Sequence, residues 1–286
     1  MGDMNNRNTL GETSSFVSGH NRAKVVGICL TVVITFTCLT LMPFSIWVWL
    51  NDHSRANNEF GLHEFMIGLT YSGLGIIFIL LLGITFIFFL RWIHRAHANL
   101  PSLGTLGLAY SPVSAVIGFC IPGLNLFYPF NTVKEIWKAS DPATNLNDQR
   151  SWENAPSSPL ITFWWILSLL LTLFPFVVYI FLSTTGLGRY DYGGYNIIGC
   201  LVLAWCLLLI IEAIMAKRII EIIDYRQEER HKRILSNSPF DKSAEKSFPL
   251  ININIRSIFS YLLRWWILPF IIMALIFGLL YIVADC

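Results

Sequence analysis

Residues 111–130 read SPVSAVIGFCIPGLNLFYPF and are largely apolar, so hydropathy alone would make them a helix that crosses a membrane. Pro112, the pair Pro122-Gly123 and Pro129 interrupt any continuous helix here. Both flanks are basic, and a crossing would move the second flank to the other membrane face. The sequence therefore predicts a re-entrant or interfacial hairpin that leaves the membrane on the side where it entered. The flanking basic residues are Arg91, Arg95, Lys134 and Lys138.

The irregular backbone of such a hairpin needs hydrogen-bond partners, which lipid does not supply. We therefore expect the other helices of the protein to surround the hairpin.

The composition of the whole chain is that of a membrane protein. Of its 286 residues, 55% are hydrophobic, 14% are aromatic and only 13% are charged, whereas a soluble domain has about 25% charged residues. This composition excludes disordered, collagen-like and disulfide-scaffold classes. The formal net charge of +2 gives no reason to expect a nucleic-acid partner.

Five further apolar stretches are long enough to cross a bilayer, which takes roughly 20 helical residues. They predict an all-α, polytopic helical bundle of five transmembrane helices plus the hairpin. A disordered cytoplasmic tail (1–24) precedes the membrane domain (25–217), and a helix extension with a linker (218–256) leads to the fifth span (257–286, apolar over 265–283). The first four spans are residues 25–50, 65–90, 160–182 and 197–215.

Lysine and arginine residues fix the predicted orientation. With the hairpin returning to its own side, 18 of the 20 fall on one side of the membrane and two, Arg55 and Arg189, on the other. The positive-inside rule then places the N-terminus in the cytoplasm and the C-terminus outside.

The polar residues around the end of the second span are the candidate binding residues. If that helix continues inward, Arg91, His94 and Arg95 share one face, with Asn99 one turn on. A basic helix end among lipid headgroups explains them best, and such pockets can bind anionic lipid. A metal bound by His94 and His97 is the weaker alternative, because two arginines would repel a cation. The six cysteines have no metal-ligand or redox spacing, so no metal or cofactor is expected.

Two other features have both a structural and a functional interpretation. Glu212 lies near the inner end of the fourth span, where it either reaches water or pairs locally, with Lys217 and Arg218 close by, or forms an intramembrane ion site. Small residues on the second span predict close packing within the bundle, or else self-association. They are Gly68, Ser72, Gly73, Gly75 and Gly83.

Three motifs between residues 91 and 140 resemble a known family of bacterial membrane proteins, the domain of unknown function 4328. They are Arg95-Ala96-His97-Ala98-Asn99-Leu100, the turn from Pro122 to Pro129 that contains Asn125, and Glu135-Ile136-Trp137. The resemblance covers residues 65–215 and implies the two-plus-two helix arrangement and a bacterial inner membrane. The family has no assigned activity to carry over. The fifth span is a departure from its pattern.

The motifs make physical sense as one clamp. Glu135 is expected to pair with Arg95, and Asn99 to bond nearby backbone, because pairing is the cheapest way to hold charges at the edge of hydrocarbon. Pro122-Gly123 breaks the hairpin, the Asn125 side chain bonds the freed backbone groups, and Pro129 ends the return arm.

The sequence favours a non-catalytic subunit or scaffold that binds a protein partner or anionic lipid at its cytoplasmic face. It has no nucleotide loop, no HExxH and no kinase or hydrolase motif, so an enzyme is disfavoured. A small transporter or channel that uses the hairpin is the first alternative, and an enzyme acting on lipid headgroups is the second. Expected partners are membrane lipid, other membrane-protein subunits or a second copy of the chain, and no nucleic acid.

Overall fold

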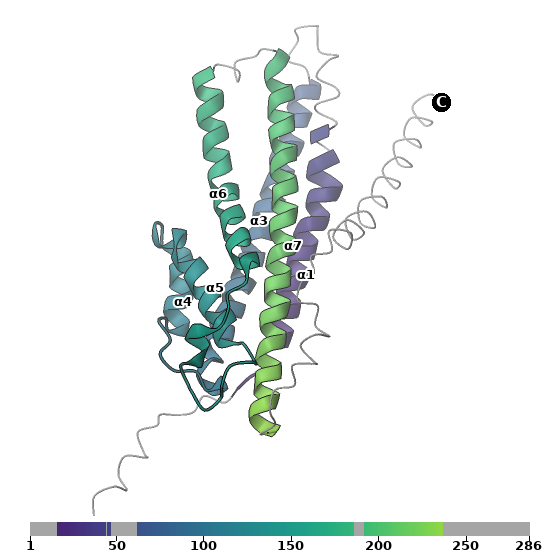
Figure 1. Ribbon diagram of the computed structural model, residues 1–286. Coiled ribbons are helices and arrows are strands. Elements are labelled where there is room, and N and C mark those ends of the chain that lie inside the picture. The colour runs from purple at the N-terminus through teal and green to yellow at the C-terminus, as the bar shows by residue number, and fades with distance from the viewer. Residues whose placement is uncertain (1–15, 44, 47–61, 186–191, 237–286) are drawn as a thin grey trace, which may run out of the picture.

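The computed structural model describes residues 16–43, 45–46, 62–185 and 192–236 (Figure 1). Every regular element in these residues is helical, which confirms the predicted all-α class. The α-helices are α1 (His20–Phe36), α3 (Leu62–Ala98), α4 (Pro112–Cys120), α5 (Tyr128–Ala139), α6 (Pro159–Thr185) and α7 (Tyr192–Ser236).

Four of these helices are long and apolar enough to cross a membrane, as a membrane protein requires. They are α1 with its π-helical continuation η1 (Thr37–Leu41), α3, α6 and α7, and they coincide with the first four predicted spans. The predicted disorder of residues 1–24 is wrong for 20–24, because α1 already begins at His20. Residues 1–15 and the predicted fifth span, 257–286, lie outside the described residues.

The four long helices alternate in direction. In Figure 1, α1 and α6 begin, and α3 and α7 end, toward the same end of the bundle, and the short helices α4 and α5 lie beside that end. We call it the hairpin end, and we call the opposite end the far end. Helix α1 packs against α3 and α7, and α6 packs against α7.

The hairpin predicted over residues 111–130 is a helix–turn–helix. Ser111 caps α4 by accepting a hydrogen bond from the Ser114 amide (3.1 Å), and Pro112 occupies the first turn, where its missing N–H costs nothing. Helix α4 ends at Cys120, and Gly123 takes a φ of 86° that a side chain would oppose. A short 3₁₀ turn, η4 (Leu124–Leu126), then leads into α5. The predicted break at Pro122-Gly123 is confirmed.

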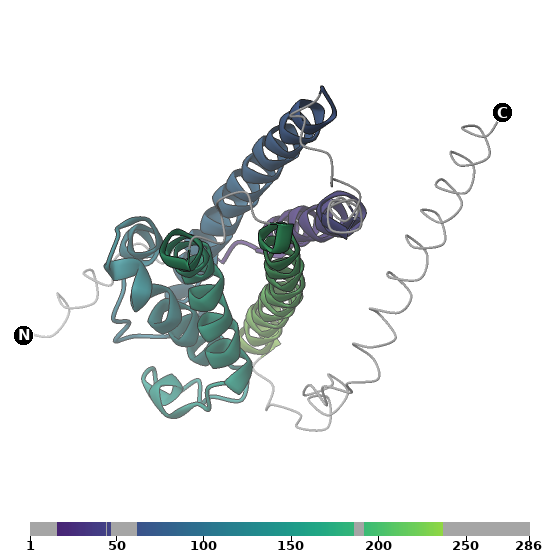
Figure 2. The same cartoon turned by 90° about the horizontal axis from the view of Figure 1, so that it is seen from above.

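The expectation that other helices surround the hairpin is wrong. The hairpin packs mainly against α3 and α6, and Figure 2 shows it at one edge of the bundle. On its outer side Val113, Ile117 and Phe127 are exposed. The physical reason is that both arms are helical and bond their own backbone groups, so they need no enclosure by protein.

The main hydrophobic core lies toward the hairpin end and draws on all six helices. Trp92 and Ile93 of α3, Ile136 of α5, Ile161 of α6 and Ile220 of α7 are almost completely buried in it. Two smaller clusters follow toward the far end, one around Phe78 and Leu209 and one around Cys206 and Ile210. The hairpin end is therefore the part of the molecule where packing is most extensive.

Helix α7 continues without interruption beyond Met215 to Ser236, which confirms the predicted helical extension as far as that residue. The remainder of the predicted linker, 237–256, lies outside the described residues.

The small residues of α3 do not pack as expected. A Cβ atom added at Gly73, Gly75 or Gly83 would meet nothing within 4 Å. In the described residues nothing packs closely against these three positions of α3, so the packing interpretation is wrong for these three glycines.

Candidate functional site

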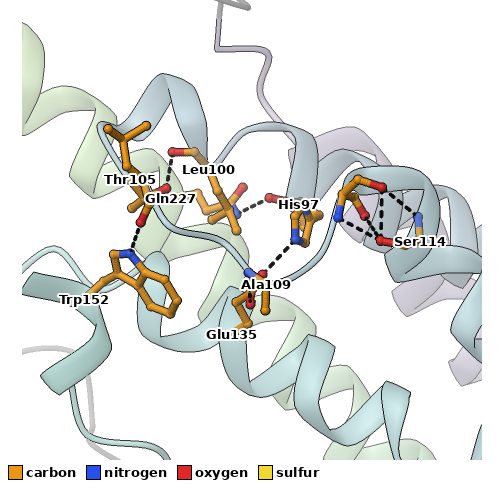
Figure 3. Close-up of polar contacts among 11 residues, drawn as sticks. His97, Leu100, Thr105, Ala109, Ser114, Glu135, Trp152 and Gln227 are labelled. Carbon is orange, nitrogen blue, oxygen red and sulfur yellow. Dashed lines mark hydrogen bonds and ion pairs between the residues drawn. The ribbon is translucent and has the colours of Figure 1, made fainter. Parts of the chain in front are cut away.

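A buried carboxylate joins α3, α5 and the loop between α3 and α4. Glu135 of α5 bonds His97 Nε2 of α3 through Oε1 (3.0 Å) and accepts the Ala109 amide through Oε2 (2.9 Å). Both side chains are almost fully buried. Figure 3 shows their contact. Glu135 thus fixes the start of the hairpin to the end of α3.

The predicted pair between Arg95 and Glu135 is therefore wrong. Arg95 and His97 are two residues apart on α3, so they point to opposite sides of the helix, and it is the His97 side that meets α5. Arg95 instead donates from Nε to the Val17 carbonyl (3.3 Å). Its Nη2 atom is buried and has no hydrogen-bond partner among the described residues.

Asn99 bonds backbone, as predicted, but the backbone belongs to the segment before α1. Its Nδ2 donates to the Val17 carbonyl (3.0 Å), and its Oδ1 accepts the Val17 amide (3.4 Å). Nδ2 also donates to Gln227 Oε1 (3.2 Å), and Gln227 Nε2 donates to the Ala96 carbonyl (2.8 Å) and to Ser140 Oγ (3.1 Å). Asn99 and Gln227 therefore connect the start of α1 to the ends of α3, α5 and α7.

Arg230 of α7 binds the carbonyl ends of neighbouring helices. Arg230 is 1% exposed and donates from Nε to the Leu103 carbonyl (2.9 Å) and from Nη1 to the carbonyls of Ala139 and Asp141 (3.0 Å each). A helix C-terminus carries partial negative charge and free carbonyls, so a cation there is stabilising. Arg230 Nη1 also donates to Thr144 Oγ1 (2.5 Å).

Trp137 of α5 packs against a second arginine of α7, Arg226. The Arg226 guanidinium stacks over its ring at 4.3 Å and donates to its carbonyl (3.3 Å). The Asp141 carboxylate lies 4.0 Å from Arg226 Nη1. Trp137, predicted from the family motif, is therefore a packing surface for the α7 extension.

The basic residues Arg91, His94 and Arg95 share one face, as expected if the helix continues, because α3 runs on to Ala98. Arg91 and His94 are exposed, and Arg95 is half-buried. Arg22 of α1 is close enough for its charge to act on Arg95. No carboxylate forms an ion pair with these arginines among the described residues.

The hairpin residues act differently from the prediction. The break after Ile121 is bridged by the Asn125 backbone amide, which donates to the Ile121 carbonyl (3.0 Å), rather than by its side chain. Pro122 is exposed at the turn. Pro129 is buried in the first turn of α5, so it begins this helix and does not end the return arm.

Aromatic packing closes the two arms of the hairpin. Tyr128 of α5 lies against Gly118 of α4, where an added Cβ would come within 2.6 Å of the Tyr128 Cβ atom and 2.7 Å of its ring. Tyr110 lies 5.2 Å from the Tyr128 ring, between centroids. Burial, reinforced by the charge of Glu135, raises the pKa of Tyr110, so this hydroxyl stays neutral well above pH 7.

Glu212 binds across to α6 instead of reaching a nearby base. Its Oε1 accepts hydrogen bonds from Trp164 Nε1 (2.8 Å) and Ser168 Oγ (3.2 Å). Lys217 donates to Thr31 Oγ1 (3.2 Å) and Arg218 pairs with Glu221 (3.1 Å). The suggested bases, Lys217 and Arg218, thus have other partners, and Glu212 connects two long helices.

The arrangement is a largely buried hydrogen-bonded network with the exposed Arg91 and the half-buried Arg95 beside it. Within the network, His97 Nδ1 is buried and has no hydrogen-bond partner among the described residues. In the described part of the chain, no three His, Cys, Asp or Glu side chains gather as a metal site would require. The motif residues lie together at the hairpin end, except Pro122 and Asn125 at the turn. Glu212 belongs to a separate contact.

The sequence prediction missed His97 as a partner of Glu135, and Arg226, Gln227 and Arg230 altogether. A signal for the last three was present, because they continue the buried stripe of Ile219, Ile220 and Ile223 at helical spacing. A polar residue on the buried side of a helix needs a partner in another element.

A family model, the domain of unknown function DUF4328, matches residues 69–219, just over half of the chain. No curated protein and no solved structure matches it. The match contains α3 from residue 69, the hairpin, α6 and the first part of α7, and it ends before Gln227 and Arg230. The family signature therefore covers the Glu135 side of the network, and the chain belongs to the DUF4328 family.

Proposed function

We propose that the protein is a non-catalytic integral membrane protein that binds anionic lipid at its cytoplasmic face. The hairpin end is the cytoplasmic end in this proposal. In the described part of the chain, all 13 Lys and Arg residues lie toward this end, and the positive-inside rule assigns such an end to the cytoplasm. The family resemblance to bacterial proteins supports the bacterial inner membrane as its location.

The hairpin of α4 and α5 enters the membrane from the cytoplasmic side and returns to it. Nine residues of α4 rise only about 13 Å, less than half of the roughly 30 Å hydrocarbon core, so this helix is too short to cross. The exposed apolar residues on the outer side of the hairpin suit contact with acyl chains. They are Val113, Ile117, Ile121, Leu124, Leu126 and Phe127.

The observation that carries the proposal is the uncompensated charge of Arg95. Its predicted carboxylate partner is occupied by His97, and Nη2 has no protein partner among the described residues. Arg22 adds a second positive charge, and Arg91 extends the basic face along α3. Half-buried charges without a counter-ion are costly, and a lipid phosphate would supply the missing negative charge.

Arginine suits this role because its planar guanidinium can donate two parallel hydrogen bonds to phosphate. The network behind the arginines sets their position. Asn99, which also donates to Gln227, holds the Val17 carbonyl that Arg95 binds. The His97–Glu135 contact sets which side of α3 faces α5. The network therefore presents a rigid basic surface at headgroup depth and needs no catalytic group.

The test is lipid selectivity in reconstituted bilayers. Spin-labelled phosphatidylglycerol and phosphatidylcholine report how many of each lipid contact the protein. We expect the wild type to prefer phosphatidylglycerol, and the R91Q/R95Q variant to lose most of that preference. Each basic residue near an anionic surface contributes about 1 kcal/mol, which is about fivefold in association.

Arg218→Gln is the matched control, because Arg218 is also a basic residue at this end but is exposed and paired with Glu221. It should keep the preference. An equal loss in the control, or no preference in the wild type, would overturn the lipid assignment. A stoichiometric protein that copurifies with the wild type and is lost from R91Q/R95Q would replace lipid by a protein partner.

A further inference from the structure

A long groove runs between α1 and α7. Helix α1 lies on the side of the bundle away from the hairpin (Figures 1 and 2). Its volume is about 970 Å³, and it extends along α1 from His20 to Thr40. Twenty helical residues rise about 30 Å, so the groove runs the depth of a bilayer core. Ile28, Val32 and Leu39 on its α1 wall are exposed.

The α1 wall of the groove is shaped for another helix. Four small side chains repeat at every fourth position and so lie in one row along the groove. Rows of this kind let helices approach closely in membranes. They are Ala23, Gly27, Thr31 and Thr35.

Acidic side chains line the hairpin end of the groove, and one of them, Glu221, is already paired with Arg218 (3.1 Å). Glu221, Asp224 and Glu228 of α7 line it, against Lys24 and Lys217. Asp224 bonds His20 Nδ1 (2.9 Å), whereas Glu228 Oε1 is buried and has no hydrogen-bond partner among the described residues. An occupant with basic residues at this end is therefore favoured over an anionic lipid.

One segment of the chain outside the described residues has this chemistry. Residues 265–283 are an uncharged apolar run of the length a bilayer requires, preceded by Arg256 and Arg264. Ala274 and Gly278 are small residues four apart, the counterpart of the row on α1.

We propose that residues 265–283, the predicted fifth span, occupy the groove between α1 and α7 and run parallel to α1. Arg256 and Arg264 then meet the carboxylates of Glu221, Asp224 and Glu228. The groove is thus an intramolecular docking site that completes the bundle, which leaves the basic face on α3 free for its separate role.

The chain is long enough for this path. Beyond Met215, α7 runs 21 residues to Ser236 and so extends about 32 Å from the inner end of the predicted fourth span. The 20 residues 237–256 can reach about 66 Å when extended, which suffices to return to the membrane beside α1.

Disulfide cross-linking tests the proposal. In a full-length chain whose native cysteines are replaced by serine, Thr35→Cys and Ala274→Cys should form an intramolecular disulfide on oxidation. The two positions lie about ten residues from the inner ends of their predicted spans. A protease site within 237–256 makes the readout clear, because the cross-linked fragments separate only after reduction.

Two matched controls move one cysteine to another face of its helix and keep it at about the same depth in the membrane. Val33 of α1 is buried against Phe78 and Leu209, so V33C with A274C should give little cross-link. Ile276 lies on the opposite face of the segment from Ala274, so T35C with I276C should also fail.

Three results would overturn the proposal. Cross-linking only between separate chains would mean that a second copy occupies the groove. Equal yields in the test and control pairs, or no cross-link in a protein that elutes as folded, would also overturn it. Bound lipid that protects Thr35→Cys from labelling would accompany the last result and assign the groove to lipid.

Discussion

The hairpin end and the far half of the bundle are built on different principles. At the hairpin end, one core draws on six helices, and buried polar groups bind helix ends across it. In the far half, small clusters around Phe78 and Cys206 join the long helices, and many apolar side chains point outward. Transmembrane helices gain little from apolar contact with one another in lipid. We infer from this difference that the hairpin end specifies the arrangement of the helices.

Substitution of Arg230, at the hairpin end, should cause the largest loss of stability. Arg230→Met removes the donor for three backbone carbonyls, and each unsatisfied buried group costs about 1–3 kcal/mol. We expect a loss of about 3 kcal/mol or more, seen as a large drop in thermal unfolding temperature in detergent. The control Arg218→Met, on the exposed side of the same helix, should change it little. Equal shifts in the two variants would show that the network is not a stabilising unit.

The contact between His97 and Glu135 should have the next largest effect on stability. A double-mutant cycle of His97→Ala and Glu135→Ala should show coupling of about 1–3 kcal/mol, because the two side chains form one buried contact. The same cycle with Arg95→Ala and Glu135→Ala should give coupling within about 0.5 kcal/mol. Unfolding in denaturant measures both. Stronger coupling to Arg95 than to His97 would reverse the assignment.

Alanine substitutions at Gly118 and Gly83 compare a closely packed glycine with an open one. Gly118→Ala places a methyl group against Tyr128, and overpacking of this kind costs about 1–3 kcal/mol. Gly83→Ala meets open space and should be neutral or slightly stabilising, because alanine is the better helix former. The unfolding temperatures of the two variants provide the check. A loss of stability at Gly83 as large as that at Gly118 would mean that another part of the assembled protein packs against Gly83.

The smallest effect is expected at Glu212, whose contact with α6 is separate from the network. Interhelical hydrogen bonds in membranes are worth about 0.6 kcal/mol on average. Glu212→Gln keeps an oxygen acceptor for Trp164 and Ser168, so stability should fall by less than about 1 kcal/mol. The measurement is the unfolding temperature at neutral pH. A loss comparable to that of Arg230→Met would place an essential charge at Glu212.

Sequence patterns predicted the long helices and the broken hairpin well, because hydropathy, proline and glycine act locally. The partners of the polar residues were harder. Choosing between Arg95 and His97 as the partner of Glu135 depends on which face of α3 meets α5, and that depends on the path of the hairpin. Gln227 and Arg230 lie more than 80 residues from the carbonyls they bind, so no local pattern links them. Pro129 was misassigned because proline both ends and begins helices.

The most direct test of the account is the side of the membrane on which the two flanks of the hairpin lie. In a background without native cysteines, Ser111→Cys, Asn145→Cys and Thr184→Cys place exposed thiols before the hairpin, after it and at the far end of α6. We expect an impermeant thiol reagent to label residues 111 and 145 from the cytoplasmic side and residue 184 from the other. Labelling of 111 and 145 from opposite sides would contradict it.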